Sequence, residues 1–151
     1  MKAEKLIEKL NMMPQEEGGM VMPTNCETEG AERAPSVHAY YYFKPHTPTL
    51  FHTIDCDEYW IYNAGSDLEV WSISKDGQLK VQKLGASEEA ELCLFFEKGV
   101  AMASRPAGMN DEGTLVSLVT VPSYSQDGLC LLSEEEVIRM CPEAEKFFRY
   151  E

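Results

Sequence analysis

Residues 51–65 read FHTIDCDEYWIYNAG and contain the most informative pattern in the chain. An apolar strand, an acidic turn, an aromatic strand and a glycine turn follow one another. Because side chains two residues apart on a strand share a face, Glu58, Trp60 and Tyr62 point the same way across the turn from His52. A lone histidine and a lone glutamate in a strand-rich protein are usually surface groups or satisfied core groups. Here the two flank a hairpin between aromatic strands, which favours a pocket.

Outward from this stretch, the chain predicts about eight short strands at roughly ten-residue spacing, which is typical of a β-sandwich or barrel. The expected strands are Val37–Phe43, Leu50–Ile54, Glu58–Tyr62, Leu68–Ser74, Leu79–Leu84, Leu92–Phe96, Ala101–Ser104 and Leu115–Val121. The Asp76 and Gly77 pair between two of them is a hairpin signal. Because strands do not alternate with helices, a doubly wound fold is excluded.

Both ends of the chain predict short helices. An apolar helical face at i, i+3, i+4 and i+7 is formed by Ala3, Leu6, Ile7 and Leu10. Pro14 ends this N-terminal segment. A capping box of Ser133 and Glu136 predicts the start of a C-terminal helix. The polar, acidic segment Thr24–Pro35 is expected to be an exposed loop.

Composition and charge exclude several classes of function. The 151 residues include 26 acidic and 13 basic side chains, for a formal charge of −13, and they predict a single domain over residues 1–151. A charge of this sign repels phosphate backbones and anionic membranes, so we expect no nucleic-acid and no membrane partner. Five cysteines without a Cys-x-x-Cys pair indicate a reducing, cytoplasmic setting without a disulfide scaffold.

The spacing His52-x-Ile54-x3-Glu58-x6-Gly65 resembles the first cupin motif, in which two histidines, a glutamate and a glycine surround a metal. Two further segments, Pro14–Gly19 and Val121–Tyr124, are similar to the cupin-5-like family of small single-domain cupins of largely unknown function. The resemblance covers about residues 4 to 125, with its motifs in the right order.

The resemblance implies an all-β fold, a double-stranded β-helix that forms a cupin jelly-roll barrel, with short N-terminal and C-terminal helices and a pocket inside the barrel. Such barrels are often dimers. A single barrel also leaves sheet edges and aromatic side chains exposed, so we expect a homodimer.

The metal-binding pattern of cupins is incomplete here. The second histidine of the first motif falls on Ile54, and the histidine of the second motif falls on Met102. Only His52 and Glu58 remain at the matched positions, whereas a catalytic metal normally has about three protein ligands. We therefore predict no stoichiometric metal and no cofactor. The same deficit disfavours a metal-dependent dioxygenase or decarboxylase.

Two hypotheses remain for function. In the first, the barrel binds a small organic molecule without chemistry. In the second, it is a metal-independent isomerase or epimerase in which Glu58 and His52 form the catalytic acid/base pair, the pKa of Glu58 being raised by an aromatic cavity. The residues expected to bind the ligand are Tyr40, Tyr42, Trp60, Tyr62 and Met102.

Overall fold

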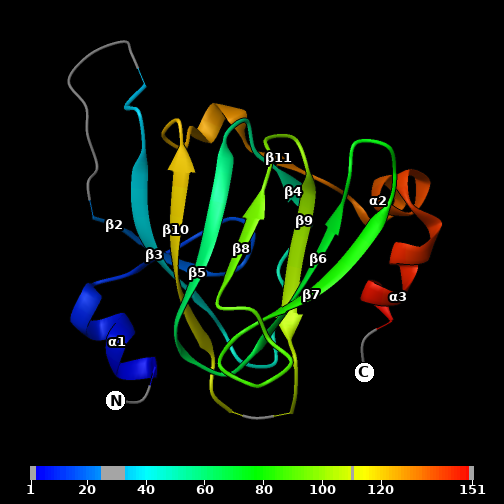
Figure 1. Cartoon of the computed structure of the whole chain (residues 1–151). Coiled ribbons are helices and arrows are strands. Elements are labelled where there is room, and N and C mark those ends of the chain that lie inside the picture. Colours follow the sequence, from blue (N-terminus) through cyan, green and yellow to red (C-terminus); the bar gives the residue numbers. More distant parts are fainter. Residues whose placement is uncertain (1–2, 25–32, 110, 150–151) are drawn as a thin grey trace.

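Two antiparallel sheets form the framework of the computed structural model, which describes residues 3–24, 33–109 and 111–149 (Figure 1). The six-stranded sheet has the spatial order β1 (Met13–Pro14), β2 (Met20–Pro23), β3 (Val37–Phe43), β10 (Thr114–Val121), β5 (Asp57–Gly65) and β8 (Cys93–Phe96). The five-stranded sheet has the order β11 (Cys130–Leu131), β4 (His52–Thr53), β9 (Ala101–Pro106), β6 (Leu68–Ile73) and β7 (Leu79–Leu84). The sheets pack face to face as a jelly-roll sandwich.

All the strands expected from the sequence are present. The bounds of β3 and β7 match the prediction, whereas the strand expected over Leu50–Ile54 is reduced to His52–Thr53. The sequence analysis missed β1, β2 and β11, which have two to four residues each. Segments this short cannot show a period of two, and their pairing depends on distant strands.

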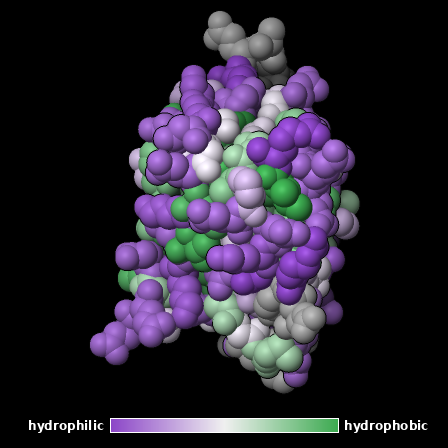
Figure 2. Space-filling model, turned by 90° about the vertical axis from the view of Figure 1, so that its right-hand side faces the viewer, coloured by the Kyte–Doolittle hydropathy of each residue, from purple (hydrophilic) through white to green (hydrophobic). Residues whose placement is uncertain are grey.

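In the described part of the chain, three α-helices lie on the outside of the sandwich: α1 (Ala3–Leu10), α2 (Glu134–Met140) and α3 (Glu145–Phe148). Two 3-10 turns, Gln126–Gly128 and Pro142–Ala144, accompany them. The predicted capping box is confirmed, since Ser133 and Glu136 each accept a hydrogen bond from the other's backbone N–H. Figure 2 shows the end that carries α2, α3 and β7 as largely hydrophilic, with apolar groups in small patches.

Alternation along the strands sorts the apolar side chains into three clusters. The space between the sheets holds one cluster, which includes Phe43, Trp60, Val70 and Met102. A second cluster joins the outer face of the five-stranded sheet to α2 and α3. The third lies between α1 and the outer face of the six-stranded sheet. The inter-sheet cluster does not fill the end of the sandwich where β3 and β5 begin and β10 ends, and a cavity lies there.

Most of the expected loop Thr24–Pro35 lies outside the described residues. Where the chain is described again, the Arg33 guanidinium forms two hydrogen bonds, of 3.0 and 3.1 Å, with the carboxylate of Asp55. It also donates to the backbone oxygen of Ser123. The segment before β3 is thus tied to the turn before β5 and to the segment after β10.

Candidate functional site

The cavity between the sheets has a volume of about 190 Å³. Its walls are largely apolar and include Val21, Val37, Phe43, Ile54, Trp60 and Leu118. An engineered apolar cavity of about 150 Å³ is large enough to hold benzene. This cavity therefore has room for a molecule of that size or slightly larger.

Glu58 is the most perturbed acid on the cavity wall. It is the second residue of β5, and the alternation of that strand turns it inward, where its side chain is 5% exposed. Burial raises its pKa to about 8, and the nearby Glu17 carboxylate contributes to the rise. The indole N–H of Trp60 approaches Glu58 and opposes the shift, although its geometry falls short of a hydrogen bond. Glu58 is therefore mostly a neutral carboxylic acid at pH 7.

His52 faces the same cavity from β4 of the opposite sheet and is also buried. Its Nδ1 lies 3.0 Å from the backbone oxygen of Leu50. A carbonyl can only accept, so His52 Nδ1 carries a proton and donates it to this oxygen. Within the described residues no hydrogen bond joins His52 to Glu58. The predicted acid/base residues thus share one cavity without contacting each other through a hydrogen bond.

Glu17 is a second buried carboxylate that the sequence analysis did not select. It lies in the turn between β1 and β2 and lines the cavity with an exposed fraction of 7%, and its Oε2 has no hydrogen-bond partner. Two glycines make this turn possible. Gly18 has φ of +120°, and a Cβ on Gly19 would lie 2.0 Å from the Tyr41 ring. The paired glycines were the sequence signal for this close approach.

Tyr41, rather than Tyr40 or Tyr42, lies on the cavity wall, which corrects the expected placement of the tyrosines. Along β3, the odd-numbered residues from Val37 to Phe43 face inward. Tyr42 is buried on the other face of the sheet beneath α1, and Tyr40 packs beside it. The Tyr41 hydroxyl accepts a 3.1 Å hydrogen bond from the Gly19 N–H. Three consecutive tyrosines gave the sequence analysis no means of choosing between the two faces.

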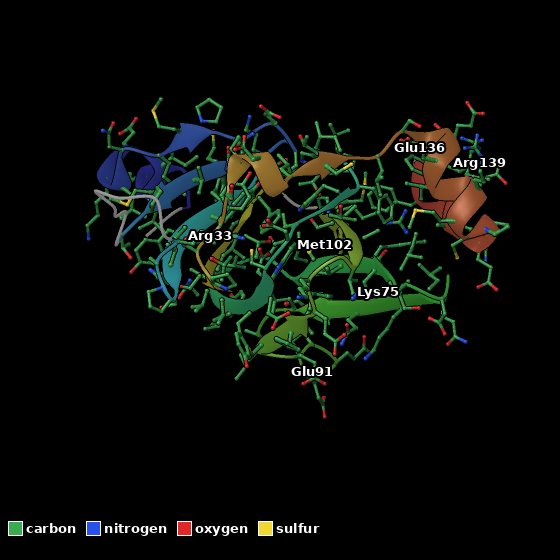
Figure 3. All side chains as sticks on the ribbon, turned by 90° about the horizontal axis from the view of Figure 1, so that it is seen from above. Arg33, Lys75, Glu91, Met102, Glu136 and Arg139 are labelled. Carbon is green, nitrogen blue, oxygen red and sulfur yellow. The ribbon has the colours of Figure 1, made fainter. Side chains whose placement is uncertain are left out.

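Of the other expected ligand-binding residues, Trp60 lines the cavity, whereas Tyr62 and Met102 do not. The Tyr62 hydroxyl donates a 2.7 Å hydrogen bond to the Gly65 backbone oxygen. The Tyr62 side chain packs against the inter-sheet cluster. Met102 is fully buried in that cluster and pairs with His52 across β4 and β9. Figure 3 shows Met102 in the interior of the molecule, far from Glu136 and Arg139 on α2.

Tyr124 is a further cavity residue that the sequence analysis did not single out for a role. It follows β10, and its backbone N–H bonds to the Thr120 hydroxyl at 3.0 Å. Burial, together with the carboxylates of Glu17, Glu16 and Glu58, raises the pKa of its phenol. Its membership of the segment Val121–Tyr124, which resembles a family motif, was the only sequence signal for it.

The donor set does not fit a metal of the usual cupin kind. Ile54 is a buried apolar residue on the cavity wall, and Met102 lies in the packed core. Across the residues that the structure describes, no three His, Cys, Asp or Glu side chains gather closely enough to hold a metal ion. At the positions that match the cupin motif, His52 and Glu58 remain as two potential ligands on opposite sheets.

The chain forms a jelly-roll sandwich with a cavity between its two sheets. His52 from one sheet and Glu58 from the other line this cavity, which is the arrangement of a cupin fold. A family model described as "Cupin superfamily (DUF985)" matches residues 4–132. The chain belongs to that family.

Solved structures agree with this fold. A protein from Shewanella oneidensis is 23% identical with a TM-score of 0.88, and the match covers 99% of this chain and 96% of that one. A hypothetical protein from Leishmania major is 22% identical with a TM-score of 0.86, covering 99% and 97%. Oxalate decarboxylase from Bacillus subtilis is 13% identical with a TM-score of 0.60, and the match covers 83% of this chain but 33% of the enzyme. No curated protein matches the sequence.

The structure also bears on membranes and on disulfides. No helix in the described part of the chain is long and apolar enough to cross a bilayer. Four of the five cysteines, Cys56, Cys93, Cys130 and Cys141, are free thiols, and Cys26 lies outside the described residues.

Proposed function

We propose that this protein binds a small organic molecule in the cavity between its sheets and does so without a metal. The observation that carries the proposal is a pair of buried polar atoms with no partner, Glu17 Oε2 and Trp60 Nε1. Leaving such an atom unsatisfied costs about 1–3 kcal/mol. Groups of this kind persist where a ligand completes their hydrogen bonding.

Native mass spectrometry of the purified protein, compared with its denatured mass, tests the proposal directly. We expect a retained or readily added ligand of roughly benzene size or slightly larger. Ala39→Leu fills space on the cavity wall, so it should abolish binding. Ala86→Leu places the same atoms on an exposed residue and should leave binding intact. Equal binding by both variants would place the ligand elsewhere.

Metal-independent acid/base catalysis is the second candidate, and the pKa of about 8 for Glu58 favours it. A general acid or base works best when its pKa lies near the working pH. If the protein is an isomerase or epimerase, the molecule recovered from it will exchange a carbon-bound hydrogen with deuterated solvent. Glu58→Gln should then stop the exchange while binding survives. Unchanged exchange in this variant would contradict the catalytic role.

A homodimer also belongs to the proposal, and the outer face of β5 and β8 is the surface that a second copy would cover. Tyr59, Ile61 and Phe95 are 42%, 38% and 48% exposed there, and the rings of Tyr59 and Phe95 lie 4.8 Å apart. Two copies of a chain with a formal charge of −13 repel each other, so they can approach most closely where a surface carries few charged side chains. Asp57 lies at the rim of this face, and its carboxylate accepts a hydrogen bond from the Lys98 backbone N–H. Sedimentation should give a dimer, and Phe95→Lys should give a monomer.

A further inference from the structure

Resting on the proposed function, we propose that the cavity selects a small protonated amine, with the ammonium group placed between Glu17 and Glu58 and the apolar part against the aromatic wall. The ligand class is therefore an organic cation of roughly benzylamine size. The inference concerns the chemistry of the molecule and goes beyond its presence in the cavity.

The first support is the charge of the lining. Glu17 and Glu58 are both more than nine-tenths buried, and the Glu17 Oε2 atom is unpartnered. No lysine or arginine is among the described residues that line the cavity. His52 lines the same cavity, and its Nδ1–H donates to the Leu50 carbonyl. These two carboxyl groups, once ionised, accept hydrogen bonds and positive charge, and they repel carboxylates and phosphates.

The second support is an internal comparison. The spacing Glu58-x-Trp60 recurs as Glu69-x-Trp71 in β6, the next strand along the chain, which belongs to the five-stranded sheet. There the Trp71 indole N–H donates to Glu69, and the Arg105 guanidinium donates to the same carboxylate at 2.7 Å. The Arg105 guanidinium also lies 4.7 Å from the Trp71 ring centroid.

The cavity has the corresponding glutamate and tryptophan but no corresponding cation within the described residues. Trp60 stacks on Phe43 at 5.2 Å, and Tyr41 and Tyr124 complete an aromatic wall. Aromatic rings attract cations, most strongly where water is excluded. A ligand ammonium thus supplies the charge that Arg105 supplies at the second site.

Binding of an ammonium should release the proton of Glu58, and the titratable groups that face Glu58 decide whether any other group changes its charge. These are Glu17 from the β1–β2 turn, Tyr41 from β3, His52 from β4, Cys56 from the turn before β5, and Tyr124 after β10. Burial raises the pKa of the Cys56 thiol to about 12, so it stays neutral, as do the two phenols. An arriving ammonium favours the charged carboxylate, so binding drives the proton off Glu58.

Isothermal titration calorimetry with three matched probes tests the inference: benzylamine, benzyl alcohol and benzoate. We expect benzylamine to bind at least tenfold more tightly than either of the others. Titration in two buffers of different ionisation enthalpy at pH 7 should show release of about 0.9 proton per site, given a pKa near 8. The affinity should rise about tenfold from pH 6 to pH 7 and level off above pH 8.

Variants assign the effect to the cavity. Glu58→Gln should abolish the proton release and weaken benzylamine binding at least tenfold. Glu97→Gln removes one exposed charge outside the cavity and should match the parent protein. Thermal melting verifies that both variants are folded, and the proton release of the parent protein tests the inference without any variant.

The outcomes separate this inference from the proposed function. Equal binding of benzyl alcohol and benzylamine, or amine binding without proton release, would overturn the ammonium assignment and still support a binding cavity. Tighter binding of benzoate would overturn the assignment in favour of an anion. If none of the three binds at millimolar concentration, the ammonium assignment fails, and so does the proposed function for ligands of this size.

Discussion

Two regions of the sandwich use the same Glu-x-Trp spacing for different purposes. At the covered end, which is the outer face of the five-stranded sheet beneath α2 and α3, Glu69 accepts from Trp71 and Arg105, and the Trp71 ring packs edge-on to Phe147 at 5.5 Å. At the cavity end, burial raises the pKa of Glu58, and Trp60 Nε1 has no partner. At the covered end, side chains of the protein itself pair the carboxylate and the indole N–H. At the cavity end, the described residues leave the indole N–H without a partner.

The difference teaches which end serves stability. A carboxylate that is paired and hydrogen-bonded contributes to the free energy of unfolding, whereas a buried carboxylate without a cation opposes it. Proteins keep such destabilising groups mainly at sites of function. The contrast gives opposite signs for equivalent substitutions, which makes it open to test.

The pH dependence of stability should show the largest effect. Glu58 titrates near 4.5 when unfolded and near 8 when folded. Between these values the folded state binds more protons, so this contribution to stability is complete below pH 4.5 and is lost as the pH rises to about 8. At up to about 1.4 kcal/mol per pH unit, the loss between pH 5 and pH 8 is about 3.5 kcal/mol.

Urea unfolding of ligand-free protein measures this loss. Glu58→Gln cannot titrate, so the parent protein should lose stability relative to the variant over this range, and the variant should be the more stable at pH 8. Parallel pH profiles for the two proteins would remove the raised pKa from the argument.

Removal of the paired carboxylate should have the opposite sign. Glu69→Ala leaves Arg105, whose side chain is 16% exposed, without its carboxylate, and leaves the Trp71 N–H without an acceptor. We expect the free energy of unfolding at pH 7 to fall by about 2–3 kcal/mol. Arg105→Ala completes a double-mutant cycle, in which the double variant should lose less than the sum of the single losses. Additive losses would mean that the ion pair contributes nothing.

Positioning of the cavity carboxylates should depend on the glycine turn. Gly19→Ala places a Cβ 2.0 Å from the Tyr41 ring, so Tyr41 or the turn that carries Glu17 must move. Overpacking of this kind costs about 1–3 kcal/mol and should also weaken ligand binding. Gly108→Ala meets nothing within 4 Å and is the matched control, with an expected change below about 0.5 kcal/mol. Equal effects in the two variants would show that the close approach is unimportant.

The sequence predicted the sandwich better than it predicted the cavity. Alternation and turn residues depend on neighbours in the chain, which is why β3 and β7 were placed with their exact bounds. Glu58, His52 and Trp60 all line the cavity. The hairpin expected between His52 and Glu58 is wrong, because β4 and β5 belong to different sheets and meet across the cavity instead. The roles of the three residues in binding and catalysis stay predictions.

What the sequence could not show depends on contacts between distant segments. Glu17 reaches the cavity only because β1 and β2 pair and pack near β3, and Tyr41 faces it only because of the register of β3. A run of three tyrosines is consistent with either register. Tyr62 and Met102 lie on inward faces, as expected, but at levels of the sandwich where side chains already fill the space.

The smallest expected effect concerns α2 at the covered end. Ser133 Oγ accepts a hydrogen bond from the Glu136 N–H at 3.2 Å, and the Glu136 carboxylate accepts one from the Ser133 N–H at 2.7 Å. Ser133→Ala removes the first bond and should lower the free energy of unfolding by about 1 kcal/mol, whereas Ser133→Asn preserves a cap and should cost only a few tenths. Because α2 packs on the outer face of the five-stranded sheet, neither variant should change ligand binding in the cavity. Weaker binding in Ser133→Ala alone would show that the two ends are coupled, which would contradict the division of labour between them.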